Sequence, residues 1–236
     1  MTDAILAIDQ GTTGSTALFI DQNVNVIAQA NREFPNHYPK PGWVEHDVAE
    51  IWQSIVQSIQ AAKEKAGEIN IRAIGITNQR ETCLFWDKHT GEPIHRALVW
   101  QDRRTADFCQ ELKDRGLSDT VRKKTGLVLD PYFSGTKAKW LLDHVKGARE
   151  RAERGDLLFG TIDTWLIWKL CGAHVTDPSN ASRTLLYNIK DGCWDDEMLS
   201  LLGIPKCTLP EVVDNAHVMG FTKGIDGLSD GIPVAG

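Results

Sequence analysis

Three short apolar runs in the first thirty residues constrain the fold more than any other part of the sequence. They are AILAID (4–9), TALFID (16–21) and VNVIAQA (24–30), separated by QGTTGS and by Gln22-Asn23. Each run has the length and apolar pattern of a strand, and each connection has the polar composition of a tight turn. The start of the chain is therefore predicted to be an antiparallel meander of two hairpins.

Strand and helix patterns alternate after this meander. A Pro-rich stretch at 34–43 is followed by Asp47 and Glu50, a capping-box pair that predicts a helix to about Ala66. Further strands are predicted at 71–77, 83–87, 97–101 and 157–161, and further helices at 104–115, 118–124, 136–144, 147–154 and 164–170. The expected class is α/β, with a mixed sheet that starts as an antiparallel meander and is flanked by helices.

The composition favours a globular protein with a small-molecule or protein partner. Apolar residues make up 42% of the chain, including 8 Trp and 7 Phe, which is enough for a buried core. Lys and Arg number 26 against 32 Asp and Glu, and the two signs are interspersed. A net charge of −6 without a basic cluster gives no electrostatic footprint for nucleic acid or for an anionic membrane.

Cysteine spacing and the N-terminal sequence point to the cytoplasm. The five cysteines are far apart and form no C-x-x-C pair: Cys83, Cys109, Cys171, Cys193 and Cys207. Isolated thiols favour a reducing compartment and no structural zinc. The start of the chain has no signal-peptide pattern, and no run reaches the ~18 apolar residues of a membrane span.

The loop from Asp9 to Ser15 (DQGTTGS) is the first candidate site. A carboxylate at a strand end can face Mg²⁺, and a Gly- and Thr-rich hairpin can turn backbone N–H groups and hydroxyls toward phosphate oxygens. The alternative is an ordinary hairpin turn, because Gly, Thr and Ser are common there for steric reasons. The loop is not a Walker A motif, since no Lys-Ser/Thr pair follows its second Gly.

Two polar clusters lie at the ends of predicted strands. They are NQRET (78–82) and WQDRR (100–104). Arg beside Glu supplies donors and acceptors together, as a ligand hydroxyl requires. The alternative for each cluster is a solvated turn with a local ion pair. Tyr132 and Phe133 form either an apolar wall of the same site or packing under the helix that follows them.

Together these segments resemble the FGGY carbohydrate kinases, and among them the glycerol kinases. The resemblance covers the whole chain and is strongest in LAIDQGTTGST (6–16), AIGITNQRET (73–82), VWQDRRTA (99–106) and TGLVLDPYFSGTKAKWLLD (125–143). It implies a ribonuclease-H-like lobe of the actin/hexokinase type, with residues 1–236 as the N-terminal kinase domain. It also implies ATP and Mg²⁺ as cofactors and glycerol as the substrate.

The resemblance assigns roles to individual residues. Asp9 would help to hold the metal ion. The residues implied at the ATP phosphates are Thr12, Thr13, Gly14, Ser15 and Thr16, and those implied at glycerol are Thr12, Arg80, Glu81, Trp100 and Tyr132. Thr16 departs from the family pattern, because many relatives carry an Arg there.

The resemblance implies ATP-dependent phosphorylation of glycerol to sn-glycerol 3-phosphate. No catalytic residue is expected within this chain, because the family's general base is an Asp just after the position of Gly236. We therefore expect a C-terminal lobe outside this chain, no activity of the chain alone, and a homo-oligomer at full length. The alternatives are a kinase of another polyol or sugar, and a non-catalytic single-lobe module for binding or assembly.

Overall fold

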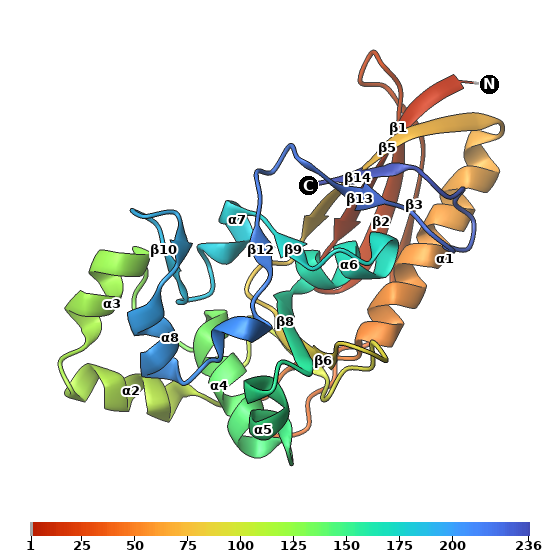
Figure 1. Cartoon of the computed structure of the whole chain (residues 1–236). Coiled ribbons are helices and arrows are strands. Elements are labelled where there is room, and N and C mark those ends of the chain that lie inside the picture. Colours follow the sequence, from red (N-terminus) through yellow and green to blue (C-terminus); the bar gives the residue numbers. More distant parts are fainter. Residues whose placement is uncertain (1) are drawn as a thin grey trace.

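The computed structural model describes residues 2–236 (Figure 1). The longer strands are β1 (Thr2–Gln10), β2 (Gly14–Ile20), β3 (Val26–Glu33), β5 (Ile69–Asn78), β6 (Cys83–Asp87), β8 (Leu157–Thr161), β13 (Val218–Phe221) and β14 (Pro233–Ala235). The two-residue strands are β4 (Glu45–His46), β7 (Ala97–Leu98), β9 (Val175–Thr176), β10 (Tyr187–Asn188), β11 (Cys193–Trp194) and β12 (Glu211–Val212). The helices are α1 (Val48–Ala66), α2 (Ala106–Asp114), α3 (Ser118–Thr125), α4 (Ser134–His144), α5 (Ala148–Glu153), α6 (Ile162–Cys171), α7 (Pro178–Ala181), α8 (Asp196–Leu202) and the 3-10 helix η1 (Lys206–Thr208).

The main sheet has six strands in the order β13-β14-β5-β1-β2-β3. The first three strands form the predicted antiparallel meander, with Ile8 opposite Ala17 in β2. Strand β5 returns beside β1 in parallel orientation after α1, and β14 adds in parallel to β5. The prediction of a mixed sheet that begins as a meander is confirmed.

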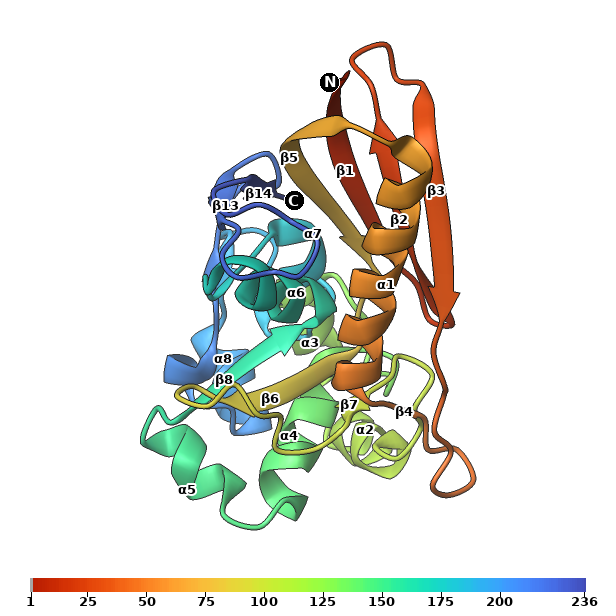
Figure 2. The ribbon, with the colours of Figure 1, turned by 90° about the vertical axis from the view of Figure 1, so that its right-hand side faces the viewer.

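Helices α1 and α6 cover one face of this sheet. Alternation along β1 turns Leu6 and Ile8 into the core, whereas Ile5 on the other face is 49% exposed. Ile51, Ile55 and Ile59 are spaced to lie on one side of α1 and are fully or almost fully buried. Figure 2 shows α1 running along the meander strands. The opposite face of the sheet is partly exposed and carries both polar and apolar side chains, such as Asp9 and Ile5 of β1.

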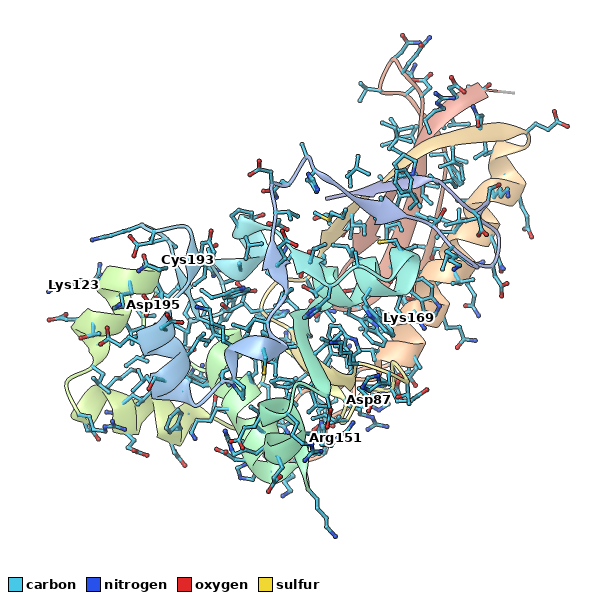
Figure 3. All side chains as sticks on the ribbon, viewed as in Figure 1. Asp87, Lys123, Arg151, Lys169, Cys193 and Asp195 are labelled. Carbon is cyan, nitrogen blue, oxygen red and sulfur yellow. The ribbon has the colours of Figure 1, made fainter. Side chains whose placement is uncertain are left out.

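A second core lies on one face of the four-stranded sheet β4-β7-β6-β8, whose other face packs on the first core. Helices α2, α4, α5 and α8 pack on it through Leu112, Leu141, Ala152 and Leu202. Arg151 of α5 and Asp87 of β6 face each other with 2.6 Å between Nη2 and Oδ2, which ties this helix to the sheet (Figure 3). Backbone N–H groups, first that of Thr90, lower the pKa of Asp87 to about 2.

The predicted helix after Asp47 is confirmed, and one strand prediction is wrong. The Asp47 carboxylate caps α1 by accepting from the Ala49 N–H at 2.9 Å, but Glu50 lies 2.8 Å from His37 Nε2 instead of closing a capping box. The strand predicted at 97–101 ends at Leu98, because a turn closed by the Asp102 N–H and the Val99 carbonyl follows it. Within residues 2–236, no helix is both long and apolar enough to cross a membrane.

Candidate functional site

The candidate site lies at the edge of the main sheet where the parallel strands β1 and β5 both end. Asp9 pairs with Thr77 and Gln10 pairs with Asn78, so the loops after the two strands start side by side. Open α/β sheets bind ligands at the carboxyl ends of parallel strands. The turn after β1 and the turn after β5 are therefore the first places to look for binding groups.

The hairpin between β1 and β2 is a tight backbone turn. The Gly11 N–H donates to the Gly14 carbonyl at 2.9 Å. A Cβ on Gly14 would lie 3.0 Å from the Arg32 carbonyl oxygen, so the adjacent strand leaves little space for a side chain there. Thr12 is half-buried and Thr13 is exposed. Backbone N–H groups and hydroxyls gathered in such a turn suit an anionic phosphate.

Asp9 and Thr16 lie on the sheet face opposite to α1. They are direct partners across β1 and β2, so their side chains share one face. Asp9 is exposed, and Thr16 Oγ1 accepts from Asn31 Nδ2 at 3.0 Å. The structure therefore places both residues beside the predicted phosphate loop.

Ser15 points to the other side of β2. Its side chain is fully buried, with Oγ 2.8 Å from Ser54 Oγ of α1, and its carbonyl accepts from Ser58 Oγ at 2.8 Å. The hydroxyl of Ser15 is hydrogen-bonded to α1 below the sheet surface and does not reach the surface of the hairpin. Any contact of Ser15 with the phosphates would therefore come from its backbone, and its predicted place near them stays a prediction.

Glu81 occupies a strained backbone conformation in the turn after β5. Its φ is 65°, and the Thr82 N–H donates to the Arg80 carbonyl at 2.8 Å, which closes a γ-turn. Such strain persists where surrounding contacts over-determine it, and it is concentrated at functional sites. Here Ser134 Oγ donates to the Glu81 carbonyl at 2.9 Å. The conformation holds a buried carboxylate next to the exposed Arg80.

Arg183 holds the Glu81 side chain and was missed by sequence reasoning. Its Nε donates to Glu81 Oε1 at 2.6 Å, and its guanidinium lies 4.9 Å from the ring centre of Phe133. The carboxylate is 3% exposed and Arg183 is 28% exposed. No donor within residues 2–236 is hydrogen-bonded to Oε2, which leaves this oxygen for a ligand hydroxyl.

Trp100 connects the two turns. Its indole Nε1 donates to Thr12 Oγ1 at 3.0 Å, and its backbone N–H donates to Thr82 Oγ1 at 3.2 Å. The ring lies 5.4 Å from the ring of Tyr132 at an angle of 57°. The structure thus brings Thr12, Trp100 and Tyr132 together, with Glu81 one residue from Thr82. Arg80 is exposed, and no ion pair of residues 2–236 includes it.

A buried hydrogen-bond network around the Gln79 amide lies beneath these turns, on their core side. Gln79 Nε2 donates to Gln10 Oε1 at 3.1 Å and to the Gly11 carbonyl at 3.2 Å, and it lies 3.2 Å from His46 Nδ1. Burial first, and then the nearby His37, lower the pKa of His46 to about 4, so its ring is neutral and Nδ1 can accept a hydrogen bond from Gln79. Gln79 Oε1 accepts from Thr82 Oγ1 at 2.9 Å. The sequence cluster at 78–82 is therefore mostly inward-facing.

Two residues of the second polar cluster, Asp102 and Arg104, have a structural role. Arg104 binds Asp102 through Nε and Nη2, at 2.9 and 2.8 Å, and its side chain is 1% exposed. The guanidinium lies against the rings of Trp43 and Trp140, 3.8 and 4.4 Å from their centres, and the two rings pack edge to face on each other. Asp102 and Arg104 thus form a buried pair under the turn that carries Trp100, and they do not face a ligand.

Asp9 is the carboxylate of this edge that fits a metal ion bound with phosphate. Residues 2–236 contain no group of three or more His, Cys, Asp or Glu side chains placed to hold a metal on their own. Magnesium is usually bound through one or two carboxylates, with substrate phosphates and water completing the coordination. A single exposed carboxylate beside a phosphate-binding hairpin agrees with that pattern.

The site thus combines parallel strand ends, a Gly/Thr hairpin and a polar turn with a buried carboxylate, a set of groups that suits a phosphate and a hydroxyl-bearing ligand. The N-terminal domain of the FGGY family of carbohydrate kinases matches residues 4–236, and the chain belongs to this family. Among its relatives, the glycerol kinase of Bacillus licheniformis is 55% identical over 236 residues, which cover 98% of this chain and 48% of that protein. Glycerol kinase 2 of Thermotoga maritima is 56% identical, with 98% and 47% covered.

Solved structures agree with this assignment. The glycerol kinase of Plasmodium falciparum, determined with ADP, superposes with a TM-score of 0.95 at 34% identity, covering 100% of this chain and 48% of that one. The gluconate kinase of Lactobacillus acidophilus has a TM-score of 0.91 at 24% identity, which shows the shared fold alone. The predicted lobe of the actin/hexokinase type is confirmed. The chain spans about half the length of the curated relatives it matches.

Proposed function

We propose that this chain is the N-terminal, polyol- and phosphate-binding domain of an ATP-dependent glycerol kinase. The reaction is transfer of the γ-phosphoryl group of ATP to glycerol, which gives ADP and sn-glycerol 3-phosphate. The observation that carries the proposal is Trp100, which is hydrogen-bonded to Thr12 of the phosphate hairpin and packed against Tyr132. One side chain therefore spans the distance between a phosphate site and a site for a small carbon chain.

Glycerol is recognised by matching its hydroxyls with fixed polar groups. Its six heavy atoms limit binding to roughly −9 kcal/mol, so selectivity depends on hydroxyls that are all satisfied. Glu81 Oε2 accepts from one hydroxyl while Arg183 holds Oε1. Arg80 donates to a hydroxyl from the exposed side of the same turn. The Trp100 ring lies under the carbon chain, and the Tyr132 phenol supplies a further hydrogen bond.

The hairpin after β1 receives the transferring phosphate. Thr12, Thr13 and Gly14 contribute hydroxyls and N–H groups, and Thr16 lies next to them on the face of Asp9. Because Thr12 Oγ1 already accepts from Trp100, its own proton is directed to another acceptor, such as a phosphate oxygen. Bound Mg²⁺, held by Asp9, supplies positive charge that offsets the phosphate oxygens. Fixed donors of this kind act most strongly on charge that develops during transfer.

The general base of the reaction is proposed to lie outside these 236 residues. In this arrangement a second lobe supplies the base and the adenine pocket, and this chain orients glycerol and the phosphates. Glycerol binding by Glu81 and phosphate binding by the hairpin therefore depend on each other, because the glycerol hydroxyl held by Glu81 has to lie in line with the phosphate. The proposed reaction is direct in-line transfer without a covalent enzyme intermediate.

A substrate panel tests the proposal. The full-length protein, here a chain that also contains the second lobe, is assayed for ADP release with glycerol, other polyols, pentoses and gluconate at saturating ATP and Mg²⁺. We expect the highest kcat/KM with glycerol, and no glycerol-dependent turnover by residues 1–236 alone. A preference for a pentose or gluconate would replace glycerol with that substrate. Absence of any acceptor-dependent ADP release would favour a binding or assembly module.

A further inference from the structure

Lys137 is a fully buried cation that the proposed reaction does not use. It lies in the first turn of α4, and its side chain is 0% exposed. Its Nζ donates to the Pro131 carbonyl at 2.8 Å and to the Tyr132 carbonyl at 2.7 Å. Burial of a charged ammonium group is costly unless it is hydrogen-bonded, so the two carbonyl contacts are what allow Lys137 to be buried. Those contacts go to the segment that carries Tyr132.

The backbone of Tyr132 is held on both sides. Its N–H donates to Asp130 Oδ1 at 2.9 Å, and its carbonyl accepts from Lys137. With both peptide groups fixed, the side chain leaves the backbone in a defined direction. The ring then rests between Trp100 at 5.4 Å and Phe133 at 5.3 Å.

The first turn of α4 also touches the other half of the polyol site. Ser134 Oγ donates to the Glu81 carbonyl at 2.9 Å, one helical turn from Lys137. The charged and titratable groups around Lys137 are the carboxylates of Glu81 and Asp102 and the thiols of Cys83 and Cys109. The two carboxylates favour the ammonium form. The helix start therefore joins the Tyr132 segment to the strained turn at Glu81.

We propose that Lys137 is a positioning residue of the polyol site, whose ammonium group holds the Pro131 and Tyr132 carbonyls and thereby fixes Tyr132 against Trp100. The identity of the ligand rests on the proposed function. The residue touches no ligand itself, so its loss affects glycerol binding through Tyr132. A displacement of about 1 Å at a binding group can change efficiency by about 100-fold.

The test compares Lys137→Met with Lys139→Met in the full-length protein. Met keeps the length and apolar stem of Lys and removes all donors. We expect Lys137→Met to raise the glycerol KM by about 10- to 100-fold with the ATP KM within about 2-fold of wild type. Lys139 lies on the same helix in a partly exposed ion pair with Asp143, and its substitution is expected to change neither KM. An unchanged glycerol KM in folded Lys137→Met would overturn the proposal.

A double variant separates positioning from general destabilisation. In a Tyr132→Ala background, Lys137→Met is expected to raise the glycerol KM by less than about 3-fold, because the group that it positions is already gone. Equal effects in both backgrounds, or a parallel loss of kcat and ATP affinity, would contradict the assignment. If the wild type phosphorylates another polyol or sugar, the proposed function fails, and the same comparison is made with that acceptor.

A wild-type pH profile applies where Lys137→Met does not fold. Burial lowers the pKa of Lys137 to about 8, whereas burial raises the pKa of Cys109 and raises that of Cys83 to about 12. Between pH 7 and pH 9 the amine is therefore the group among these three that loses its charge. The glycerol KM is expected to rise at least about 3-fold over this interval with a constant ATP KM, since charge-assisted hydrogen bonds are about twice as strong as neutral ones. A flat glycerol KM would overturn the proposal.

Discussion

The indole N–H of Trp100 donates to Thr12 Oγ1 at 3.0 Å, although the two residues are 88 positions apart in the sequence. This hydrogen bond joins the hairpin after β1 to the turn after β7. The backbone N–H of Trp100 also donates a hydrogen bond to Oγ1 of Thr82, the residue after Glu81. The predicted phosphate-binding and polyol-binding residues are thus connected through Trp100. A substitution in one group is therefore expected to change binding by the other.

A double-mutant cycle measures that connection. Trp100→Phe and Thr12→Val each remove the bond, and a hydrogen bond of this kind contributes about 0.5–1.5 kcal/mol, or about 2- to 13-fold in kcat/KM for glycerol. We expect a coupling energy of about 1 kcal/mol between the two substitutions in the full-length protein. Thr12→Ser keeps the hydroxyl and serves as the matched control. Strict additivity would show that the contact has no part in the reaction.

Arg183 is expected to support glycerol binding through Glu81. Arg183→Ala leaves a carboxylate that is 3% exposed without its partner, and hydrogen bonds to charged groups are worth about 1.5–3 kcal/mol. The glycerol KM should therefore rise about 10- to 100-fold. Arg103→Ala is the control, because it breaks a more exposed pair, in which the Arg103 side chain is 56% exposed and that of Asp130 33%. It should weaken glycerol binding by less than about 1 kcal/mol. Equal effects of the two substitutions would argue against the role of Arg183.

Asp9→Asn should mainly affect phosphoryl transfer. It removes the charge proposed to face Mg²⁺ and keeps the shape, so we expect kcat to fall by about 100-fold or more, a loss typical of one charge-stabilising group, with the glycerol KM little changed. Asp3→Asn is the control, because Asp3 lies on the same face of β1 at its other end. The readout is kcat as a function of Mg²⁺ concentration. An unaltered Mg²⁺ dependence in Asp9→Asn would mean that the hairpin is only a turn.

Asp163 makes folding stability depend on pH. Burial raises its pKa from 3.8 to about 6, although the hydroxyls of Thr161 and Thr176 donate to its carboxylate. Between these values the folded state binds more protons than the unfolded state, so stability falls as pH rises from about 4 to about 6. Asp163→Asn lacks this penalty. Its free energy of unfolding relative to wild type should rise by up to about 3 kcal/mol over the same interval, measured by urea denaturation. No pH dependence of that difference would contradict the raised pKa.

The parts of the site that follow the strand pattern were predictable. The meander, the hairpin after Asp9 and the polar turn after β5 are local features, and the structure contains them. The inward direction of the Ser15 side chain could have been predicted as well, since strand alternation puts it on the face of Ala17 and Phe19. Both of these residues are buried against α1.

Long-range ion pairing was beyond the reach of sequence patterns. Arg183 and Glu81 are 102 positions apart, and no local signal indicates that they meet. Lys137 lies in a helix with one other lysine, Lys139, and a lysine there is normally expected at the surface. Its burial depends on two carbonyls of a preceding loop whose path only the folded structure defines. Asp102 and Arg104 look like a ligand-binding cluster in sequence and are instead a buried pair, with the guanidinium packed against two Trp rings.

The most direct test of the central claim is the identity of the product formed by the full-length protein. Wild type and Glu81→Gln are incubated with ATP, Mg²⁺ and glycerol, and sn-glycerol 3-phosphate is quantified enzymatically alongside ADP. The account predicts that wild type forms ADP and sn-glycerol 3-phosphate in equal amounts, and that Glu81→Gln reduces kcat/KM for glycerol by at least about 10-fold, because a carboxylate that accepts from a hydroxyl is lost. Phosphorylation of glycerol at the other primary hydroxyl, or a Glu81→Gln variant with wild-type efficiency, would contradict it.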